Sequence, residues 1–490
     1  MIYDVIIIGG GVTGCCIART LSKYDLNICL LEKEADIASG TSKANSGVIH
    51  AGYASPRDYI KRHLAIRGNK LYTQAAEELN FPFKRIGSFV VALEDNQIKQ
   101  LEEERKKGVE DGIPGLEVIL NKEKIKKVEP RLTDEVVGVL HAPTGGLASP
   151  YELTFALAEN AAMNGVKIFR NHRVVKITHQ EYIFTVRTLA GEFKSRNIIN
   201  AAGLYAAQIS KMLGLDYFSI TPRKGEYILF DRNAIQLNKI LFPMPTKISK
   251  GILVCPTLHG NTFIGPNAQN IPDLEDISTT TSGLKEILEG ATRLVPSLPV
   301  RSSIRNFAGL RAVPEGYDFI IDNTDVYGFI NVAGILSPGL TATFAIAEKV
   351  VEFLELLGEN LKVKEDYNPI RPKPERFKDF TKEELDKKIQ EDPTWGRIIC
   401  RCETIPEKEI IDAIHAPVGA TTVDGVKFRC RPGMGRCQGG FCRPRVIEIL
   451  SRELKRTYEE ITKRGEDTNI LIGKTKDFLL NQKREGSRGK

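Results

Sequence analysis

The stretch YDVIIIGGGVTGCCIARTLSKYDLNICLLEKE, residues 3–34, decides the fold of this chain. Tyr3–Ile8 is an apolar run interrupted only by Asp4, which is typical of a strand buried in a parallel sheet. Gly9, Gly11 and Gly14 follow it in the pattern G-x-G-x-x-G, which allows a tight strand-to-helix turn and close approach of the backbone to a pyrophosphate. The stretch therefore predicts a strand, a glycine turn and a helix that bind a dinucleotide.

An acidic residue completes this pattern. Glu32 lies 18 positions after Gly14, at the end of a second predicted strand. A carboxylate at that place accepts hydrogen bonds from ribose hydroxyls, while the N-terminus of the helix attracts the phosphates. The alternative is a turn that is merely tight and binds nothing. The flanking strands and the position of Glu32 favour dinucleotide binding.

Composition limits the class of protein. A chain of 490 residues, with 42% hydrophobic and 27% charged residues, is expected to form about two to four soluble globular domains. No apolar run approaches about 18 residues, so we expect no transmembrane segment, and the first apolar run is too short for a signal peptide. We therefore expect a cytoplasmic protein, with peripheral membrane association left open. In that compartment clustered thiols indicate metal ligands rather than disulfides.

The positive charge is concentrated near the end of the chain. The net charge is +7, and residues 397–490 contain 20 Lys and Arg against 13 Asp and Glu. This balance indicates either an acidic partner or simple solubility. No nucleic-acid-binding motif accompanies it, so nucleic acid is not an expected partner.

A small, hydroxyl-rich segment, ASGTSKANSGVIHAGY at residues 38–53, distinguishes between cofactors. It resembles the flavin-contacting segment of the D-amino-acid oxidase superfamily of FAD-dependent oxidoreductases. Further similar motifs follow in the expected order, among them NIINAAGLYA, PRKGEYILF, FAGLRAVPEGYDFII and FINVAGILSPGLTATFAIAE. The chain is most similar to FAD-dependent glycerol-3-phosphate dehydrogenases that end in a bacterioferritin-associated-ferredoxin-like (BFD-like) domain. L-2-hydroxyglutarate dehydrogenases resemble it too.

This resemblance implies an α/β fold with a Rossmann-like FAD-binding domain, an inserted antiparallel-sheet substrate domain and a small C-terminal iron–sulfur module. The expected FAD-binding domain is discontinuous and comprises residues 1–80, 147–215 and 310–367. The expected substrate domain comprises residues 81–146 and 216–309. After them we expect a linker at 368–396, rich in proline and charge, the [2Fe–2S] module at 397–460 and a basic tail at 461–490.

The motif and the resemblance together assign residues to the FAD site. The expected contacts are Gly9, Gly11, Gly14, Glu32, Thr41, Ser42, Asn45, Ser46, Gly47, Val174, Gly203, Gly334, Gly339, Leu340 and Thr341. The helix that starts near Leu340 would direct its positive end at the flavin ring and stabilise negative charge there. For Val174 the alternative is a buried strand residue without contact to the nucleotide.

Oxidation of an alcohol or amine by a flavin requires a proton acceptor and, for an anionic substrate, a cation. His50, in the flavin-contacting segment, and His259, in LHGNTFIGP, are the two candidate bases, and the sequence does not choose between them. Arg311, in FAGLRA, is the first candidate to bind a carboxylate or phosphate, because the resemblance implies that the arginine of this motif binds the substrate anion, and a guanidinium suits both groups. Lys224 is the weaker candidate.

One departure from the family bears on the substrate. Membrane-type glycerol-3-phosphate dehydrogenases follow the residue equivalent to His50 with Gly-Gly-Leu-Arg-Tyr, whose arginine helps to hold phosphate. This chain has Ala-Gly-Tyr-Ala-Ser at residues 51–55. A 2-hydroxyacid such as 2-hydroxyglutarate, or an amino acid of the proline type, is therefore an alternative to sn-glycerol 3-phosphate. A non-catalytic electron-transfer subunit is a second alternative.

Five of nine cysteines lie between residues 400 and 442. The spacing Cys400-x-Cys402 and, 34 residues later, Cys437-x4-Cys442 differs from the C-x2-C that zinc sites favour. The segment resembles the BFD-like module, which implies that these four cysteines bind a [2Fe–2S] cluster. Zinc and free thiols are the alternatives, and the role of Cys430 stays open. Several arginines surround the ligands: Arg429, Arg431, Arg436, Arg443 and Arg445.

A flavin followed by a cluster implies electron transfer out of the chain. A flavin takes two electrons from a substrate, and a cluster passes them on singly. Because the chain has no second nucleotide-binding motif, we expect an electron-accepting partner and a hetero-oligomer. The partner could be an NADH-linked flavoprotein, another iron–sulfur protein or a quinone-linked acceptor.

Overall fold

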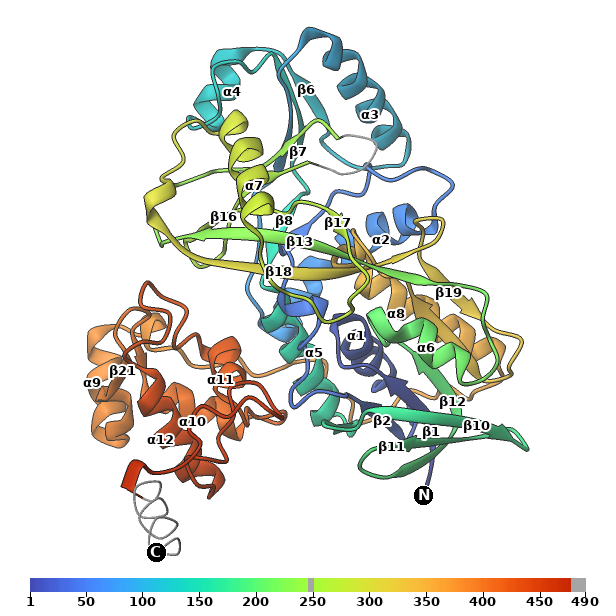
Figure 1. The fold of residues 1–490 in the computed structure, drawn as a ribbon. Helices are drawn as coiled ribbons and strands as arrows, with labels where there is room; N and C mark the ends of the chain where they lie inside the picture. The colour runs from blue at the N-terminus through green and yellow to red at the C-terminus, as the bar shows by residue number, and fades with distance from the viewer. Residues whose placement is uncertain (246–250, 477–490) are drawn as a thin grey trace, which may run out of the picture. The chain divides into compact units, whose positions relative to one another are not determined.

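The computed structural model describes residues 1–245 and 251–476 of the chain (Figure 1). The chain divides into two compact units, Met1–Pro374 and a second unit that begins at Glu375. The first unit contains two large sheets, and the second is mainly helical. The predicted α/β class is confirmed.

The first sheet has eight strands and a parallel centre in the order β20–β12–β1–β2–β9. These strands are β1 (Ile2–Ile8), β2 (Ile28–Leu31), β9 (Lys167–Phe169), β12 (Glu192–Asn200) and β20 (Phe329–Ala333). Three antiparallel strands extend it: β10 (Val174–Gln180), β11 (Ile183–Thr188) and β19 (Ile320–Asn323). Helices α1 (Val12–Leu21), α5 (Pro150–Met163) and α8 (Gly339–Leu356) pack together, α1 against both of the others.

The second sheet has nine strands and is mostly antiparallel. It consists of β5 (Ser88–Ala92), β6 (Glu117–Ile119), β7 (Gly138–Ala142), β13 (Ile220–Phe230), β14 (Ile240–Pro243), β15 (Leu253–Pro256), β16 (Thr262–Gly265), β17 (Gln269–Asn270) and β18 (Ser303–Pro314). Helices α3 (Ile98–Glu110), α4 (Lys122–Val128) and α7 (Thr281–Leu294) lie on the side of this sheet away from α1, α5 and α8 (Figure 1).

The two faces of β13 have different neighbours. Ile228 and Phe230 belong to the core that includes Ile287 of α7. Tyr227 instead packs in a cluster with Val48, which lies in the predicted flavin-contacting segment, and with Leu147, the strand partner of Val48. Since successive side chains of a strand point to opposite faces, even-numbered positions of β13 face α7 and odd-numbered positions face the flavin-contacting side.

A small sheet connects the layers of the first unit. It contains β3 (Val48–Ile49), β8 (Gly146–Ala148) and β4 (Phe83–Arg85), in the order β3–β8–β4. Helix α2 (Ile60–Leu79) packs along α8, and the short helix α6 (Ala206–Lys211) packs against β20. Gly68 allows the first of these contacts, because a Cβ there would come within 2.2 Å of the Thr341 carbonyl oxygen.

The second unit contains four helices and a two-stranded sheet in its described part. They are α9 (Lys382–Glu391), β21 (Ile398–Cys400), β22 (Ile405–Pro406), α10 (Glu407–His415), α11 (Val423–Cys430) and α12 (Arg443–Leu454). Ile410, Val426 and Leu450, one from each of the last three helices, are fully buried in a shared core.

Some predicted boundaries differ from the observed elements. The predicted boundary at residues 309 and 310 falls inside β18, which belongs whole to the nine-stranded sheet. The predicted linker 368–396 contains helix α9, and Trp395, at its end, is buried against Phe380. Ile461, in the predicted tail 461–490, is buried in the second unit's core, and the last part of that tail lies outside the described residues.

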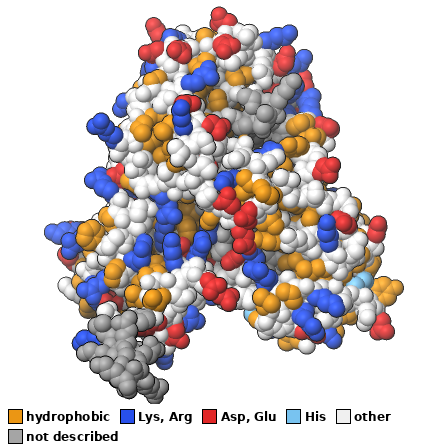
Figure 2. Space-filling model, viewed as in Figure 1, with side chains coloured by type: hydrophobic (Ala, Val, Ile, Leu, Met, Phe, Trp, Pro, Cys, Tyr) orange, Lys and Arg blue, Asp and Glu red, His pale blue; other side chains and the backbone are white. Residues whose placement is uncertain are grey.

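Helix α3 is largely exposed, since it buries only Leu101 and Gly108, and side chains of both charge signs lie on the visible face of the molecule (Figure 2). Over residues 1–245 and 251–476, no helix has the length and hydropathy needed to cross a membrane.

Candidate flavin, substrate and iron–sulfur sites

The turn between β1 and α1 depends on its glycines. Gly9 has a φ of +112°, and a Cβ there would lie 2.4 Å from the Ala201 carbonyl oxygen. A Cβ on Gly14 would lie 2.0 Å from the Gly9 carbonyl oxygen. At Gly11 the nearest atom to such a Cβ is the Ser42 Oγ, at 3.3 Å, and Gly11 caps α1 without a side chain. Space therefore remains over the helix N-terminus, where a pyrophosphate fits.

Glu32 lies beside this turn, directly after β2. Its Oε2 accepts a hydrogen bond of 2.7 Å from the Gly10 backbone N–H, and its Oε1 accepts one of 2.8 Å from the Glu34 N–H. Burial raises the pKa of Glu32. A buried acceptor at the edge of the turn has the chemistry that a ribose diol requires.

The flavin-contacting segment is fixed on two sides. The Ser42 Oγ accepts a hydrogen bond of 2.8 Å from the Val12 N–H at the start of α1, and the Thr41 Oγ1 donates one of 2.6 Å to the Leu310 carbonyl of β18. A Cβ on Gly309 would come within 1.9 Å of the Ala44 carbonyl oxygen, so β18 lies directly against this segment. The segment thus lies between the two layers of the first unit.

The other predicted flavin contacts come from several elements of the first unit. Asn45 donates to the Thr41 and Ser42 carbonyls at 3.1 Å and accepts from the Gly47 N–H at 2.9 Å; the neighbouring Ser46 is half-buried. Helix α8 begins at Gly339 with no side-chain cap, and the Leu340 carbonyl accepts from the Tyr72 hydroxyl. Gly334 and Gly203 both have left-handed φ, at +63° and +57°. Val174 starts β10 and packs in the core.

His50 is held through its backbone. Its N–H donates a hydrogen bond of 2.9 Å to the Thr341 Oγ1, and its carbonyl accepts one of 2.8 Å from the Asn69 side chain. The ring lies 5.7 Å from the Phe242 ring, and the Ser337 Oγ is 3.5 Å from Nε2. The structure therefore places His50 at the start of α8, the helix that the sequence analysis expects to face the flavin ring.

Arg311 lies on β18 and is positioned by neutral acceptors. Its Nη2 donates to the Asn267 carbonyl at 2.5 Å and to the Lys224 carbonyl at 3.3 Å. A Cβ on Gly225 would lie 2.5 Å from this nitrogen, so that glycine makes the room the guanidinium occupies. Arg311 shares its face of β18 with Gly309 and therefore faces the flavin-contacting segment.

The other two catalytic candidates are placed differently. Lys224 is an even-numbered residue of β13, and its ammonium forms a 2.8 Å ion pair with Asp276, which holds the pKa of that carboxyl well below its usual range. The structure does not bring Lys224 to the face that carries Arg311. His259 Nε2 lies 2.9 Å from the Glu152 carboxylate of α5.

Three residues of β13 lie on the same face as Arg311 and were not among the site residues predicted from the sequence. Arg223, Gly225 and Tyr227 share the odd-numbered face with the register partner positions Arg311, Gly309 and Phe307 of β18. Burial raises the pKa of Tyr227 to about 12, and Arg311 counteracts part of this rise. The alternation in PRKGEY could have indicated these residues if the inward face of the strand had been known.

The four predicted cluster ligands gather in the second unit. Cys402 and Cys437 have their Sγ atoms 3.7 Å apart, and Cys442 donates a hydrogen bond to Cys400. A [2Fe–2S] cluster needs four cysteine ligands around two irons, and these four thiols form two pairs. Cys400 and Cys442 are buried, Cys437 is half-buried and Cys402 is exposed.

Backbone N–H groups stabilise thiolates here. The Cys442 thiol, with the N–H groups of Gly433 and Glu403, lowers the pKa of Cys400 to about 6. The Phe441 N–H, then the Gly439 N–H, lowers the pKa of Cys437. Thiolates are the form that binds iron. The donor set therefore fits a [2Fe–2S] cluster.

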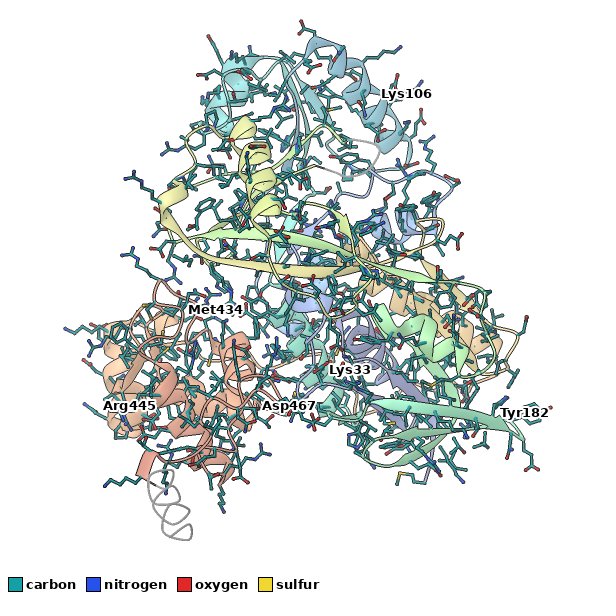
Figure 3. All side chains as sticks on the ribbon, in the orientation of Figure 1. Lys33, Lys106, Tyr182, Met434, Arg445 and Asp467 are labelled. Carbon is teal, nitrogen blue, oxygen red and sulfur yellow. The ribbon has the colours of Figure 1, made fainter. Side chains whose placement is uncertain are left out.

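Cys430 and the arginines differ in their surroundings. Cys430 is buried in the core of the second unit, and burial raises the pKa of its thiol. Arg429 is buried and donates to two backbone carbonyls, and Arg431 pairs with Glu403 at 2.9 Å. Arg445, labelled in Figure 3, lies in the first turn of α12 and pairs with Glu448 at 2.7 Å. The remaining two, Arg436 and Arg443, are exposed.

Comparisons with known proteins identify the family of each unit. Residues 4–353 match the family described as FAD dependent oxidoreductase, and residues 398–452 match the BFD-like [2Fe-2S] binding domain. A protein named glycerol 3-phosphate dehydrogenase from Caloramator mitchellensis is 46% identical over 97% of this chain and 99% of its own length.

Shorter relatives match the first unit. A glycerol 3-phosphate oxidase from Mycoplasma genitalium is 35% identical over 75% of this chain and 97% of its own. The solved structure of dithionite-reduced L-alpha-glycerophosphate oxidase from Mycoplasma pneumoniae, with FAD bound, matches with a TM-score of 0.72 at 33% identity, over 76% of this chain and 98% of its own. The chain belongs to the FAD-dependent oxidoreductase family of the D-amino-acid oxidase type and carries a C-terminal BFD-like [2Fe–2S] domain.

Proposed function

We propose that this chain oxidises the secondary alcohol of sn-glycerol 3-phosphate to the ketone of dihydroxyacetone phosphate and passes the electrons through its cluster to an acceptor. The relative with 46% identity spans both units and bears the corresponding name. The observation that carries the proposal is Arg311, a positioned cation that faces the flavin-contacting segment and, among the described residues, is hydrogen-bonded only to neutral carbonyl groups.

FAD would be held at the glycine turn of β1 and α1, with Glu32 at the ribose and the segment around Ser42 at the ring side. When bound, it supplies a two-electron acceptor for the hydride of the carbinol carbon. The start of α8 would direct its positive end towards the reduced ring.

The chain's own residues would bind the substrate and remove its proton. Arg311 would bind the anionic end, which fixes the distance from that end to the reacting carbon. His50 would accept the hydroxyl proton, because its backbone is anchored by Thr341 and Asn69 beside the ring site. His259 is the less suitable base, since Glu152 engages its Nε2.

Cys400, Cys402, Cys437 and Cys442 would bind the [2Fe–2S] cluster. It would supply single-electron transfer, and the exposed side of its ligand set would be the exit. Around Cys402 and Cys437 the exposed side chains include a large apolar one, Phe441, at 86% exposure, and cationic ones: Arg401, Arg436 and Arg443. An electron-accepting partner with an acidic surface suits this chemistry.

The substrate is tested by anaerobic bleaching of the bound flavin. We expect an excess of sn-glycerol 3-phosphate to remove the flavin absorbance, whereas 2-hydroxyglutarate, lactate and proline leave it unchanged over the same time. Bleaching by one of the carboxylates instead of glycerol 3-phosphate would transfer the proposal to that substrate. If none of them bleached the flavin, a catalytic role on these substrates would be wrong.

A further inference from the structure

Two arginines lie directly opposite each other in the nine-stranded sheet of the first unit. Arg223 of β13 and Arg311 of β18 are register partners, and Asn270 of β17 is the register partner of Arg223 on its other side. Residues directly opposite in an antiparallel pair point to the same face, with Cβ atoms about 4.5–5.5 Å apart. Because Gly309 on this face touches Ala44, both guanidinium groups lie on the side of the flavin-contacting segment.

The charges of this pair are not neutralised within the described chain. Arg223 donates to the Asn270 Oδ1 at 2.7 Å and to the Tyr317 hydroxyl at 3.0 Å, and it stacks over the Tyr317 ring at 5.2 Å. Arg311 donates to two backbone carbonyls. Across residues 1–245 and 251–476, neither arginine forms an ion pair with a carboxylate.

Like charges directly opposite each other destabilise a sheet. The effect extends to protonation, since Arg223 adds to burial in lowering the pKa of Arg311. The nearby carboxylate of Asp276 does not relieve it, because it pairs with Lys224 on the other face of β13. A pair of cations kept in this arrangement by neutral hydrogen-bond acceptors is suited to an anion with more than one negative charge.

We propose that Arg223 is a second substrate-binding residue, which together with Arg311 binds the phosphate group and selects phosphate over carboxylate substrates. The inference rests on the proposed function. A phosphate dianion has three terminal oxygens and can accept hydrogen bonds from two guanidinium groups at once, whereas a carboxylate is satisfied by one. Arg223 would replace the phosphate-binding arginine that this chain lacks after His50.

A purely structural role for Arg223 makes a different prediction. If the residue served only to hold Tyr317 and β17, its loss would weaken all ligands alike or lower the stability of the protein. If it binds phosphate, its loss would weaken phosphate ligands selectively. Inorganic phosphate and acetate are therefore suitable probes, because they share a site at Arg311 and differ in charge and in number of oxygens.

The experiment measures binding of each probe to the FAD-loaded protein through the change in flavin absorbance. In Arg223→Gln we expect the dissociation constant of phosphate to rise at least about thirtyfold and that of acetate to change less than about threefold. Arg223→Lys, which keeps the charge, should recover part of the phosphate affinity. Arg187→Gln, which removes a strand arginine that is 65% exposed, is the matched control and should change neither.

Equal weakening of both probes, or unchanged phosphate binding, would overturn the inference. If Arg223→Gln does not retain FAD, the Arg223→Lys variant is used instead. In that variant, dissociation constants of phosphate and acetate that shift by the same factor would contradict the inference. Kinetics separate this result from the proposed function. Wild-type protein that binds phosphate through Arg223 but is not reduced by glycerol 3-phosphate would refute the function alone, whereas wild-type-like KM in Arg223→Gln would refute the inference alone.

Discussion

The substrate region and the iron–sulfur module place their reactive groups in different ways. In the module, four thiols come from one stretch of chain between Cys400 and Cys442, and backbone N–H groups of that same stretch surround them. In the substrate region, His50 is anchored by Thr341, which lies 291 positions away in the chain, and strand pairing places Arg223 opposite Arg311. The first arrangement is local, while the second exists only once two sheets have formed.

The difference has a consequence for substitutions. A change in the module should remove one function and leave the other intact, because the two units have separate cores. A change at the glycine turn should remove every activity, since all chemistry starts at the flavin. A change on the substrate sheet should alter efficiency according to the face of the strand on which it lies.

The largest effect is expected at Gly11. A Cβ on Gly11 would meet only the Ser42 Oγ, so we expect Gly11→Val to fold but to fill the space over the start of α1. We expect the flavin content of the purified variant, measured by absorbance after denaturation, to fall at least about tenfold. Gly191→Ala, at an open turn with no atom within 4 Å of the new Cβ, is the control and should retain full flavin content.

The second effect concerns the anion-binding face. Arg311→Lys keeps the charge but loses the planar guanidinium that its two carbonyl acceptors position, so catalytic efficiency with glycerol 3-phosphate should fall at least about tenfold, or about 1.4 kcal/mol. The measurement is anaerobic steady-state turnover with a dye that accepts electrons from the flavin. Unchanged efficiency would place the anion elsewhere.

The third effect separates the two faces of β13. Lys224→Gln removes the ion pair with Asp276 on the α7 side, so we expect a loss of about 1–2 kcal/mol in the free energy of unfolding and a change in efficiency below about threefold. Denaturant titration and dye turnover measure the two quantities. A fall in efficiency as large as that of Arg311→Lys would return Lys224 to the substrate site.

The smallest effect on function is expected at Cys430, within the module. Its thiol is buried among apolar side chains, so Cys430→Ser should lower the free energy of unfolding by about 1–2 kcal/mol through burial of a hydroxyl. The iron content per chain and the visible spectrum of the cluster should stay unchanged. Loss of iron from this variant would make Cys430 a ligand.

The same contrast explains how much the sequence could predict. The fold class, the strand–turn–helix around Gly9 and the BFD-like domain are confirmed, because each depends on residues close together in the chain. The motif PRKGEYILF lies in β13. Which of its faces meets the flavin side is not visible in the sequence, and a shift of one residue exchanges Lys224 for Arg223.

Contacts between residues that are distant in the sequence could not be predicted either. His259 faces Glu152 across 107 positions, and no local pattern indicates that pair. The proline- and charge-rich segment predicted as a linker forms α9 because Thr381 and Glu384 make a capping box and Trp395 supplies a buried anchor after it. Composition alone did not reveal these signals.

The central claim is that the flavin is reduced by glycerol 3-phosphate and that the cluster is the exit for its electrons. Anaerobic rapid mixing of wild-type protein and Cys437→Ser with glycerol 3-phosphate tests it most directly, with flavin absorbance and the low-temperature EPR signal of a reduced [2Fe–2S] cluster as the two readouts. We predict flavin bleaching in both proteins at rates within about threefold, and an EPR signal in the wild type only. An unbleached flavin in the wild type, or bleaching without a reduced cluster in the wild type, would contradict the claim.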